Sequence, residues 1–550
     1  MAQPEVFIRE KSGFTRTMGF ADALIFNMIC IGFFTASIFS YQLSPFAFPG
    51  ANISITFLLT IVLALPLYLV WSSMSSSMPR TGGDYIYQSR IVSPVVAFAA
   101  SFSFTIFWQF WYDASFAIQV TIQSIVPPIL RAGYLSGDPG LMQLASATGS
   151  ELSVFLITVV VLGLAALAAS PGLPFYVKLQ RVLFALTLMG VVVILYLYAT
   201  ATPAIFRSNF NDFMASYTGT SQDWYQVIID TAKDNGWTLV EYNWTDTLLA
   251  VPITLMCMGY GFWTIFVFSE VKRANDFKLA TYQMVGALVI MGLLFASLYA
   301  VMINAVGREF YDALFWLYFM GDAVPNNPVF QIPLSNPNYI FLADMLTGNM
   351  VLSLALAIGT GAAAFCLVTQ IVIVISRMLT AMTFDRLWPA KLGYVGTKWV
   401  SPIYANFVIF LVDVVFAWVG VYYPTFSFYS GAAVLGAWLG YVVDSVAAIQ
   451  FKKKMPEVYE ASAVSRYEIA GRPLTEIVGW LNLIFCAFIL YVYAAYWEYI
   501  LGLAEFAIPG VLLVVSVYIG SAIYYMFVKW YRMNRQGIDI TLAFRQIPPE

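Results

Sequence analysis

The chain has 550 residues, of which 60% are hydrophobic and only 10% are charged, and its mean hydropathy is +0.77. Because a soluble domain carries about 25% charged residues, this composition excludes an ordinary soluble protein and predicts a helical chain that crosses the lipid bilayer many times. The formal charge of −3 says little by itself, since the positions of the charges matter more. We expect no nucleic-acid partner, and the question of protein partners stays open.

The chain contains no histidine, and its four cysteines, Cys30, Cys257, Cys366 and Cys486, lie in separate apolar stretches. Their spacing fits neither a disulfide framework nor a zinc site. The absence of histidine excludes His-ligated haem and copper sites and leaves proton chemistry to carboxylates, lysines and tyrosines. Because the sequence also lacks a nucleophile–base pair, a phosphate loop and a metal cluster, we expect no enzyme, no metal and no cofactor.

Hydropathy over windows of about 19 residues predicts twelve membrane-spanning helices. The first apolar stretch is too long for a cleavable signal peptide, so we interpret it as the first retained span. The predicted spans lie near residues 19–45, 51–78, 94–130, 152–170, 175–200, 246–271, 280–304, 347–383, 401–422, 425–452, 474–500 and 505–533.

The distribution of charge predicts the orientation of these spans. With the N-terminus inside, all but four of the 27 Lys and Arg residues fall on the cytoplasmic side. The exceptions are Arg131, Arg207, Lys233 and Arg308. Since cytoplasmic loops are enriched in Lys and Arg, we expect an integral protein of the plasma membrane with its N- and C-termini in the cytoplasm.

The spans divide the chain into seven segments. We predict a cytoplasmic N-terminal segment (1–18), five spans (19–200), an extracellular loop (201–245), five further spans with an outer loop at 305–346 (246–452), a cytoplasmic linker (453–473), two last spans (474–533) and a cytoplasmic tail (534–550). The first outer loop contains the sequon Asn243-Trp244-Thr245, which makes Asn243 a candidate for N-glycosylation.

Two of the predicted spans contain residues that interrupt a helix. The sixth span includes Pro252 and the triplet Gly259-Tyr260-Gly261, and the first contains Gly32, with Thr35 close by to cap freed backbone. In hydrocarbon, backbone freed by a helix break must find a partner or line a wet cavity. Interrupted helices at matching positions of two halves therefore predict a binding site near the middle of the membrane.

Three motifs follow one another on the predicted inner face: MPRTGGDYIY at 78–87, SEVKR at 269–273 and SRMLTAMTFDRLWP at 376–389. Together and in this order they resemble signatures of the amino acid–polyamine–organocation (APC) superfamily. Residues 78–87, MPRTGGDYIY, resemble its Pro-x-x-Gly-Gly-x-Tyr signature after the second span. The end of the sixth span, Ser269-Glu270-Val271-Lys272-Arg273, is similar to its Glu-x-Lys signature. After the eighth span, residues 376–389, SRMLTAMTFDRLWP, resemble its Ser-Arg…Ala-Met…Asp…Pro signature. The resemblance extends over roughly residues 14–533.

The resemblance implies an all-α membrane protein of twelve transmembrane helices, with the inverted 5+5 repeat of the leucine-transporter fold and two C-terminal helices. It implies a secondary active permease that carries amino acids or related organic amines, driven by protons, sodium or exchange, by symport or antiport. Its alternating access would rock a bundle of spans one, two, six and seven against a scaffold of spans three, four, eight and nine. The small-molecule substrate would lie between broken spans one and six.

We expect the substrate to contact the two breaks. The candidates are Gly32, Phe33, Phe34, Thr35, Met258, Gly259, Tyr260, Gly261 and Phe262. Amides at the N-terminus of a half-helix attract an anionic group, and carbonyls of the sixth span suit an ammonium. The family commonly has a Gly-x-Gly stretch in the first span, whereas this chain has one Gly followed by two Phe, which puts a standard grip on an α-amino acid in question.

Three residues are candidates for coupling transport to an ion gradient. Asp113 lies near the middle of the third span, where a carboxylate is costly and functional by default, so it suits a proton carrier. Thr369 in the eighth span is a candidate sodium ligand. Lys178 opens the fifth span near the place where some proton-coupled relatives carry a lysine, but alignment through Gln180 puts Pro174 at that place, so we favour a membrane anchor for Lys178. We interpret Asp413 and Asp444 as structural.

Glu270, at the inner end of the sixth span, is predicted to pair with Arg377 or Arg80 in an inner gate; the alternative is a solvated helix end. Two alternatives to a carrier of this fold stay open. One is a membrane scaffold or sensor that has lost transport, which a solid side-chain plug at Phe33 and Phe34 would indicate. The other is a major-facilitator fold, against which we count the missing Gly-x-x-x-Asp-Arg loop after the second span.

Overall fold

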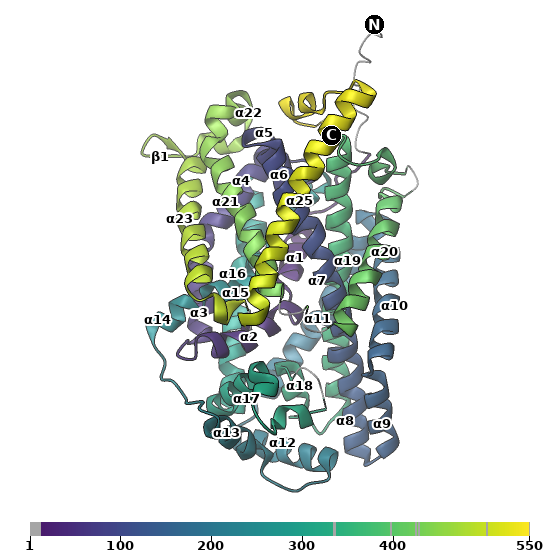
Figure 1. Cartoon of the computed structure of the whole chain (residues 1–550), viewed down its shortest axis with the longest axis vertical. Coiled ribbons are helices and arrows are strands. Elements are labelled where there is room, and N and C mark those ends of the chain that lie inside the picture. The colour runs from purple at the N-terminus through teal and green to yellow at the C-terminus, as the bar shows by residue number, and fades with distance from the viewer. Residues whose placement is uncertain are drawn as a thin grey trace.

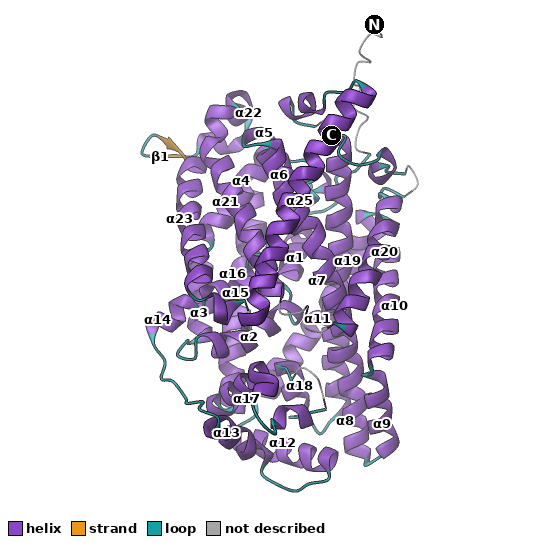
Figure 2. Cartoon of the chain, viewed as in Figure 1, coloured by secondary structure: helices purple, strands orange, loops and turns teal. Residues whose placement is uncertain are grey.

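The computed structural model describes residues 13–333, 337–396, 399–423, 426, 429–501 and 504–548. Residues 1–12 of the predicted N-terminal segment therefore lie outside the described part. Figure 2 shows that helices make up almost the whole described chain and that strands are confined to one short hairpin. That hairpin pairs β1 (Glu468–Ile469) with β2 (Arg472–Pro473) in antiparallel register.

The first five spans are built from helices that are broken in two places and π-helical in two others. The first span is α1 (Phe20–Ile31) and α2 (Thr35–Ala47), and the second is α3 (Ile53–Leu63) and α4 (Leu65–Ser77), followed by α5 (Asp84–Ile91). The third span consists of α6 (Pro94–Ser101), the π-helical turn Phe102–Trp108, α7 (Gln109–Gln119), the π-helical turn Val120–Ile125 and α8 (Val126–Ser136). After the short helix α9 (Pro139–Thr148), the fourth span is α10 (Glu151–Ala169) and the fifth is α11 (Leu173–Ala199).

The middle of the chain carries two long outer connections and the second broken span. The first connection holds α12 (Pro203–Thr218) and α13 (Trp224–Asp234). The sixth span is α14 (Trp244–Leu249), α15 (Val251–Met258) and the 3₁₀ turns Trp263–Phe266 and Phe268–Glu270, and the seventh is α16 (Phe277–Val306). The second connection holds α17 (Arg308–Met320), the 3₁₀ turns Gly321–Ala323 and Pro328–Gln331, and α18 (Tyr339–Asp344).

The last five spans are straighter. They are α19 (Met350–Phe384), α20 (Ile403–Tyr422), α21 (Ser430–Lys454), α23 (Leu474–Ala495) and α25 (Ala504–Gln536). The shorter elements between and after them are the 3₁₀ turn Ala390–Gly393, α22 (Pro456–Ala461), the turn Ala463–Arg466, α24 (Trp497–Ile500) and the turn Ile540–Arg545.

Within the described residues, eleven helices are long and apolar enough to cross a membrane, and α1 with α2 makes a twelfth, bent span. This confirms the polytopic, all-α fold of twelve spans, with span ends within about five residues of the predicted ones. The chain leaves large apolar side chains exposed on the outer faces of α10 and α20, among them Leu156, Val160, Leu411 and Val415. Such faces are suited to contact with lipid, because lipid tails are as apolar as these side chains.

The two ends of the bundle differ in the elements that close them. Figure 1 places α5, α22, the β1 hairpin and the C-terminus at one end, and α12, α13, α17 and α18 at the other. The described start of the chain joins the first of these ends, because the backbone amides of Thr17 and Met18 donate to the Glu270 carbonyl. The inner and outer segments predicted from charge thus gather at opposite ends of the bundle.

Candidate functional site

The break in the first span is set by a glycine in a left-handed conformation. Gly32 has φ +81° and follows the last residue of α1, and α2 leaves at an angle of 40°. A Cβ at this position would lie 2.9 Å from the Cβ of Ala36, so a larger residue is strained both by its backbone and by contact. Thr35 is the first residue of α2, and no side-chain hydrogen bond caps that helix from Phe34.

Both phenylalanines of the break pack sideways into the fifth span. The Phe33 ring meets Phe184 edge-on at 5.8 Å between centroids, and the Phe34 ring lies against Gly190. Neither lines the cavity described below. The solid plug that would indicate a non-transporting scaffold is therefore not formed by these two side chains.

The break in the sixth span is held open by tyrosines from two neighbouring helices. The Tyr68 hydroxyl donates to the Met258 carbonyl at 2.5 Å and accepts from the Gly261 amide at 3.1 Å. The Tyr441 hydroxyl donates to the Gly259 carbonyl at 3.1 Å. Two of the carbonyls that we expected to bind a substrate ammonium are thus already paired with protein hydroxyls.

Small residues make these contacts possible. A Cβ on Gly261 would lie 2.5 Å from the Tyr68 oxygen, so only glycine lets this hydroxyl reach the backbone. Phe262, one residue on, stacks on Trp71 at 3.6 Å with planes 17° apart. The phenylalanine therefore belongs to the packing beneath the break, and Tyr260 is the member of this stretch that lines the cavity.

A cavity of about 240 Å³ lies between the two breaks. Cys30 and Ala36 flank the first break and contribute to its wall, and Met256, Tyr260 and Trp263 contribute from the second. Beyond the breaks, the cavity reaches Tyr318 and Phe319 of α17, at the end of the bundle that carries the long connections. The cavity thus contacts both interrupted spans and α17 of the second long connection.

The third span supplies much of the remaining wall, which sequence reasoning missed. Gln109, Trp111, Tyr112, Ser115, Phe116, Ile118, Gln119 and Ile122 all line the cavity. The π-helical turns before and after α7 change which face of this span points inward, and π turns often occur at functional sites. The one feature of the sequence that could have indicated this role of the third span is the presence of polar Gln109 and Gln119 in an otherwise apolar stretch.

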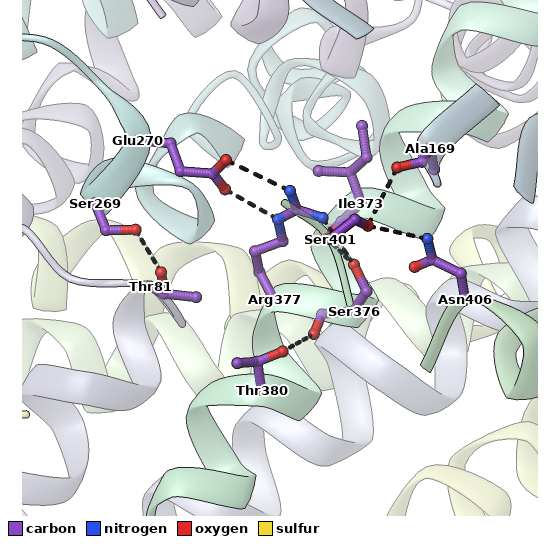
Figure 3. Close-up of polar contacts among 10 residues, drawn as sticks. All are labelled: Thr81, Ala169, Ser269, Glu270, Ile373, Ser376, Arg377, Thr380, Ser401 and Asn406. Carbon is purple, nitrogen blue, oxygen red and sulfur yellow. Dashed lines mark hydrogen bonds and ion pairs between the residues drawn. The ribbon is translucent and has the colours of Figure 1, made fainter. Parts of the chain in front are cut away.

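A buried ion pair joins the sixth span to the eighth (Figure 3). The Arg377 Nε donates to Glu270 Oε1 at 3.0 Å, and both side chains are 0% exposed. A second contact joins the end of the sixth span to the loop after the second span, since the Thr81 and Ser269 hydroxyls lie 2.5 Å apart. The ring of Phe14 covers the Arg377 guanidinium at 5.0 Å.

Arg80, the alternative partner of Glu270, lies elsewhere. Its Nε donates to the Pro548 carbonyl at 2.6 Å, which ties the loop after the second span to the C-terminal segment. Next to it, the buried pair Arg90–Asp385, 2.8 Å long, is covered by the Phe544 ring at 5.0 Å from the guanidinium. Arg80 thus contacts the C-terminal segment, and Arg377 is the partner of Glu270.

Asp113 lies in α7 with its side chain fully buried, facing α20 and away from the cavity. The Asp413 carboxyl of α20 acts on it electrostatically. Apart from each other, the two carboxyl groups have no ion-pair or hydrogen-bond partner among the described residues. Asp413, which we interpreted as structural, therefore lacks a counter-charge just as Asp113 does.

Neither of the other two coupling candidates lines the cavity. Lys178 is exposed on α11, while Tyr176, two residues earlier, points inward and contacts the Cys366 sulfur at 3.2 Å. The Thr369 hydroxyl donates to the Phe365 carbonyl of its own helix at 2.9 Å. Within the described residues, no group of acidic or cysteine side chains gathers as metal ligands would.

Asn243 lies at the outer end of the sixth span and caps α14. Its side-chain oxygen accepts from the Asp246 amide at 2.8 Å, and its Nδ2 donates to the Asp246 carboxylate at 3.2 Å. The same Nδ2 packs against Gly50, where a Cβ would lie 2.0 Å away. In this fold, the nitrogen that would carry a glycan is already engaged.

The fold and the cavity define a membrane transport protein built around two interrupted helices. The model of the amino acid permease family matches residues 21–527, which is almost the whole chain. The chain belongs to this family, within the APC superfamily, and is thus a membrane-embedded transporter of amino acids with a small-molecule substrate. No individual curated protein matches it.

Proposed function

We propose that the chain is a secondary active transporter that binds its amino acid in the cavity between the first and sixth spans. One observation carries this proposal: a single cavity touches Ala36 beside the first break and Tyr260 and Trp263 in the second. Broken helices leave main-chain groups free to bind polar ligands in the membrane. The break of the first span offers the uncapped N-terminus of α2 to a carboxylate.

We further propose that the structure is the inward-closed state of an alternating-access cycle. The pair Glu270–Arg377, the Thr81–Ser269 contact and Phe14 together separate the cavity from the end that holds the C-terminus. Opening this end requires Glu270, on the sixth span, to separate from Arg377, on the eighth. Because Lys and Arg concentrate at this end, it is the cytoplasmic end in our account.

For coupling, we propose that Asp113 and Asp413 hold a transported proton. Two buried carboxyl groups with no described counter-charge cannot both be ionised in a medium of low dielectric. Gaining or losing a proton here alters the contact between α7, which lines the cavity, and α20. Such a change links proton occupancy to the shape of the substrate site.

The test is uptake of labelled amino acids into proteoliposomes with and without an inward proton gradient. We expect the gradient to stimulate uptake by the unmodified protein, and Asp113→Asn and Asp413→Asn to lose the stimulation while retaining exchange of substrate across the membrane. Asp444→Asn is the matched control, because the oxygens of this buried carboxyl group already accept hydrogen bonds from Trp71 and Gln88. Stimulation that persists in both variants would exclude this pair, and stimulation by sodium alone would exclude protons.

A further inference from the structure

The cavity wall carries no charge. Among its described lining residues there is no Asp, Glu, Lys or Arg, and the polar members are amides, hydroxyls and one thiol. The charges of the pair Glu270–Arg377 neutralise each other, and neither residue lies in the wall. A ligand with a net charge would thus be buried without a counter-ion, and burial of an unpaired charge in a membrane interior is expensive.

Two polar groups of the cavity wall are buried and lack hydrogen-bond partners among the described residues. One is the Gln109 side-chain oxygen, in a residue only 2% exposed, and the other is the Tyr260 hydroxyl, in a residue 8% exposed. The Tyr260 hydroxyl faces that of Tyr112 without normal hydrogen-bond geometry. A buried polar atom without a hydrogen-bond partner destabilises the protein. A ligand that forms hydrogen bonds with these two atoms removes that destabilisation, which favours its binding.

The remaining wall is mainly aromatic. Phe39, Trp111, Phe116, Trp263 and Phe319 line it, and Tyr260 adds a ring that is stacked on Phe104 at 5.7 Å. The indole nitrogen of Trp111 is already bonded to the Ser430 hydroxyl at 2.8 Å, so this ring offers the ligand an apolar face. Aromatic walls favour apolar and aromatic side chains through burial and stacking.

We propose that the site selects net-neutral, zwitterionic amino acids with a large apolar or aromatic side chain, and that Gln109 and Tyr260 determine this specificity. This inference rests on the proposed substrate site. The Gln109 oxygen accepts a hydrogen bond from the ligand's polar end, and the Tyr260 hydroxyl forms a hydrogen bond with the same end. Because Gln109 lies in the third span and Tyr260 in the sixth, one ligand bridges the two parts of the fold.

The test measures binding in detergent, where no gradient and no transport step is required. The probes are phenylalanine, leucine, lysine, glutamate and choline, and the readout is the concentration-dependent rise in melting temperature. We expect phenylalanine and leucine to stabilise the protein and the other three to have no effect at the same concentrations. Stabilisation by lysine, glutamate or choline that equals or exceeds that by phenylalanine would overturn the proposal.

The two residues are tested by substitutions that preserve shape. Tyr260→Phe keeps the ring and removes the hydroxyl, and Gln109→Leu removes the amide; we expect each to weaken phenylalanine binding about tenfold, as the loss of one hydrogen bond does. Gln109→Glu at pH 8 adds a charge to the wall, and we expect it to gain lysine binding and to lose phenylalanine binding. The matched control is Gln331→Glu, at a side chain exposed in the outer connection.

The outcomes separate this inference from the proposed function. Unchanged phenylalanine binding in both Tyr260→Phe and Gln109→Leu would remove these residues from recognition, even if the protein transports. Net-neutral selectivity in binding without uptake into liposomes would leave the inference intact and contradict the transport cycle. If Gln109→Glu fails to fold, the two shape-preserving variants decide the question.

Discussion

The Arg377 guanidinium and the Glu270 carboxylate form a salt bridge 3.0 Å long that is entirely shielded from solvent. These residues are 107 positions apart in the chain and belong to the eighth and sixth spans. A third group, the Ser376 hydroxyl, accepts from the same guanidinium at 3.2 Å. Because removing one member of a buried ion pair leaves an uncompensated charge, the proposed closed state depends on both residues.

Removing one member of this pair is expected to open the inner side. For Glu270→Ala and for Arg377→Ala, the unpaired charge left behind destabilises the closed state by roughly 3–5 kcal/mol. The measurement is thiol labelling of Ser269→Cys from the cytoplasmic side, on a background of four buried native cysteines. We expect labelling to rise in either variant and to rise less than additively in the double variant. Additive effects would show that the two charges do not stabilise each other.

Replacing the glycine at the first break tests the need for a left-handed residue there. Gly32→Ala combines a backbone penalty of roughly 1 kcal/mol with a contact of 2.9 Å to Ala36, so we expect both a lower melting temperature and loss of substrate binding. Gly137→Ala is the matched control, because its φ is +66° and nothing lies within 4 Å of an added Cβ. Equal effects of the two substitutions on binding would remove the special role of Gly32.

A carboxyl group of the second long connection makes stability depend on pH. Burial raises the pKa of Asp312, in α17, to about 7, although Arg308 at 3.2 Å favours the ionised form. The groups around it are Arg308 and the hydroxyls of Tyr242, Tyr299 and Tyr311. In the unfolded chain the pKa of Asp is about 3.9, so the folded protein holds its proton more tightly.

This carboxyl group therefore contributes stability that is full below pH 4 and is lost as the pH rises to about 7. The span of about three pKa units corresponds to at most about 4 kcal/mol. We expect Asp312→Asn to flatten the fall in melting temperature between pH 4 and pH 7, while Asp322→Asn, at an exposed position of the same connection, leaves the slope unchanged. An unaltered slope in Asp312→Asn would assign the dependence to other groups.

The C-terminal segment is expected to detach when its one buried ring is removed. Phe544 is 7% exposed and lies over Arg90, so Phe544→Ala costs roughly 3 kcal/mol of docking energy. We expect limited proteolysis to cleave the Phe544→Ala variant after Gln536 more than ten times faster than the unmodified protein. Leu542→Ala provides the control, since this neighbour is 55% exposed. Comparable cleavage of both variants would mean that Phe544 does not hold the segment down.

The spans and the break in the sixth span were predictable because they depend on local properties. Apolar runs set the span ends, and the glycines of Gly259-Tyr260-Gly261 coincide with the end of α15 at Met258. An ion pair of Glu270 with Arg377 or Arg80 was one of two expectations, because their motifs place all three at the predicted inner face, and the structure shows the pair with Arg377. Predicting these features requires only the hydropathy of the chain and the positions of its glycines and charged residues.

The wall supplied by the third span was not predictable in the same way. Which side chains of α7 face inward depends on the rotation of the helix, and the π-helical turns Phe102–Trp108 and Val120–Ile125 shift that rotation without a marked change in composition. The direction of Phe33 and Phe34 depends likewise on space left beside Gly190, more than 150 residues away. Such contacts are set by tertiary packing.

The most direct test of the account is uptake of phenylalanine into proteoliposomes by protein whose cavity has been filled. Ala36→Trp adds bulk from the first span and Ser115→Phe adds it from the third, both at positions in the wall. We predict saturable uptake by the unmodified protein and none above background by either variant, with each variant still folded by its melting curve. Undiminished uptake by both folded variants would contradict the placement of the substrate in this cavity.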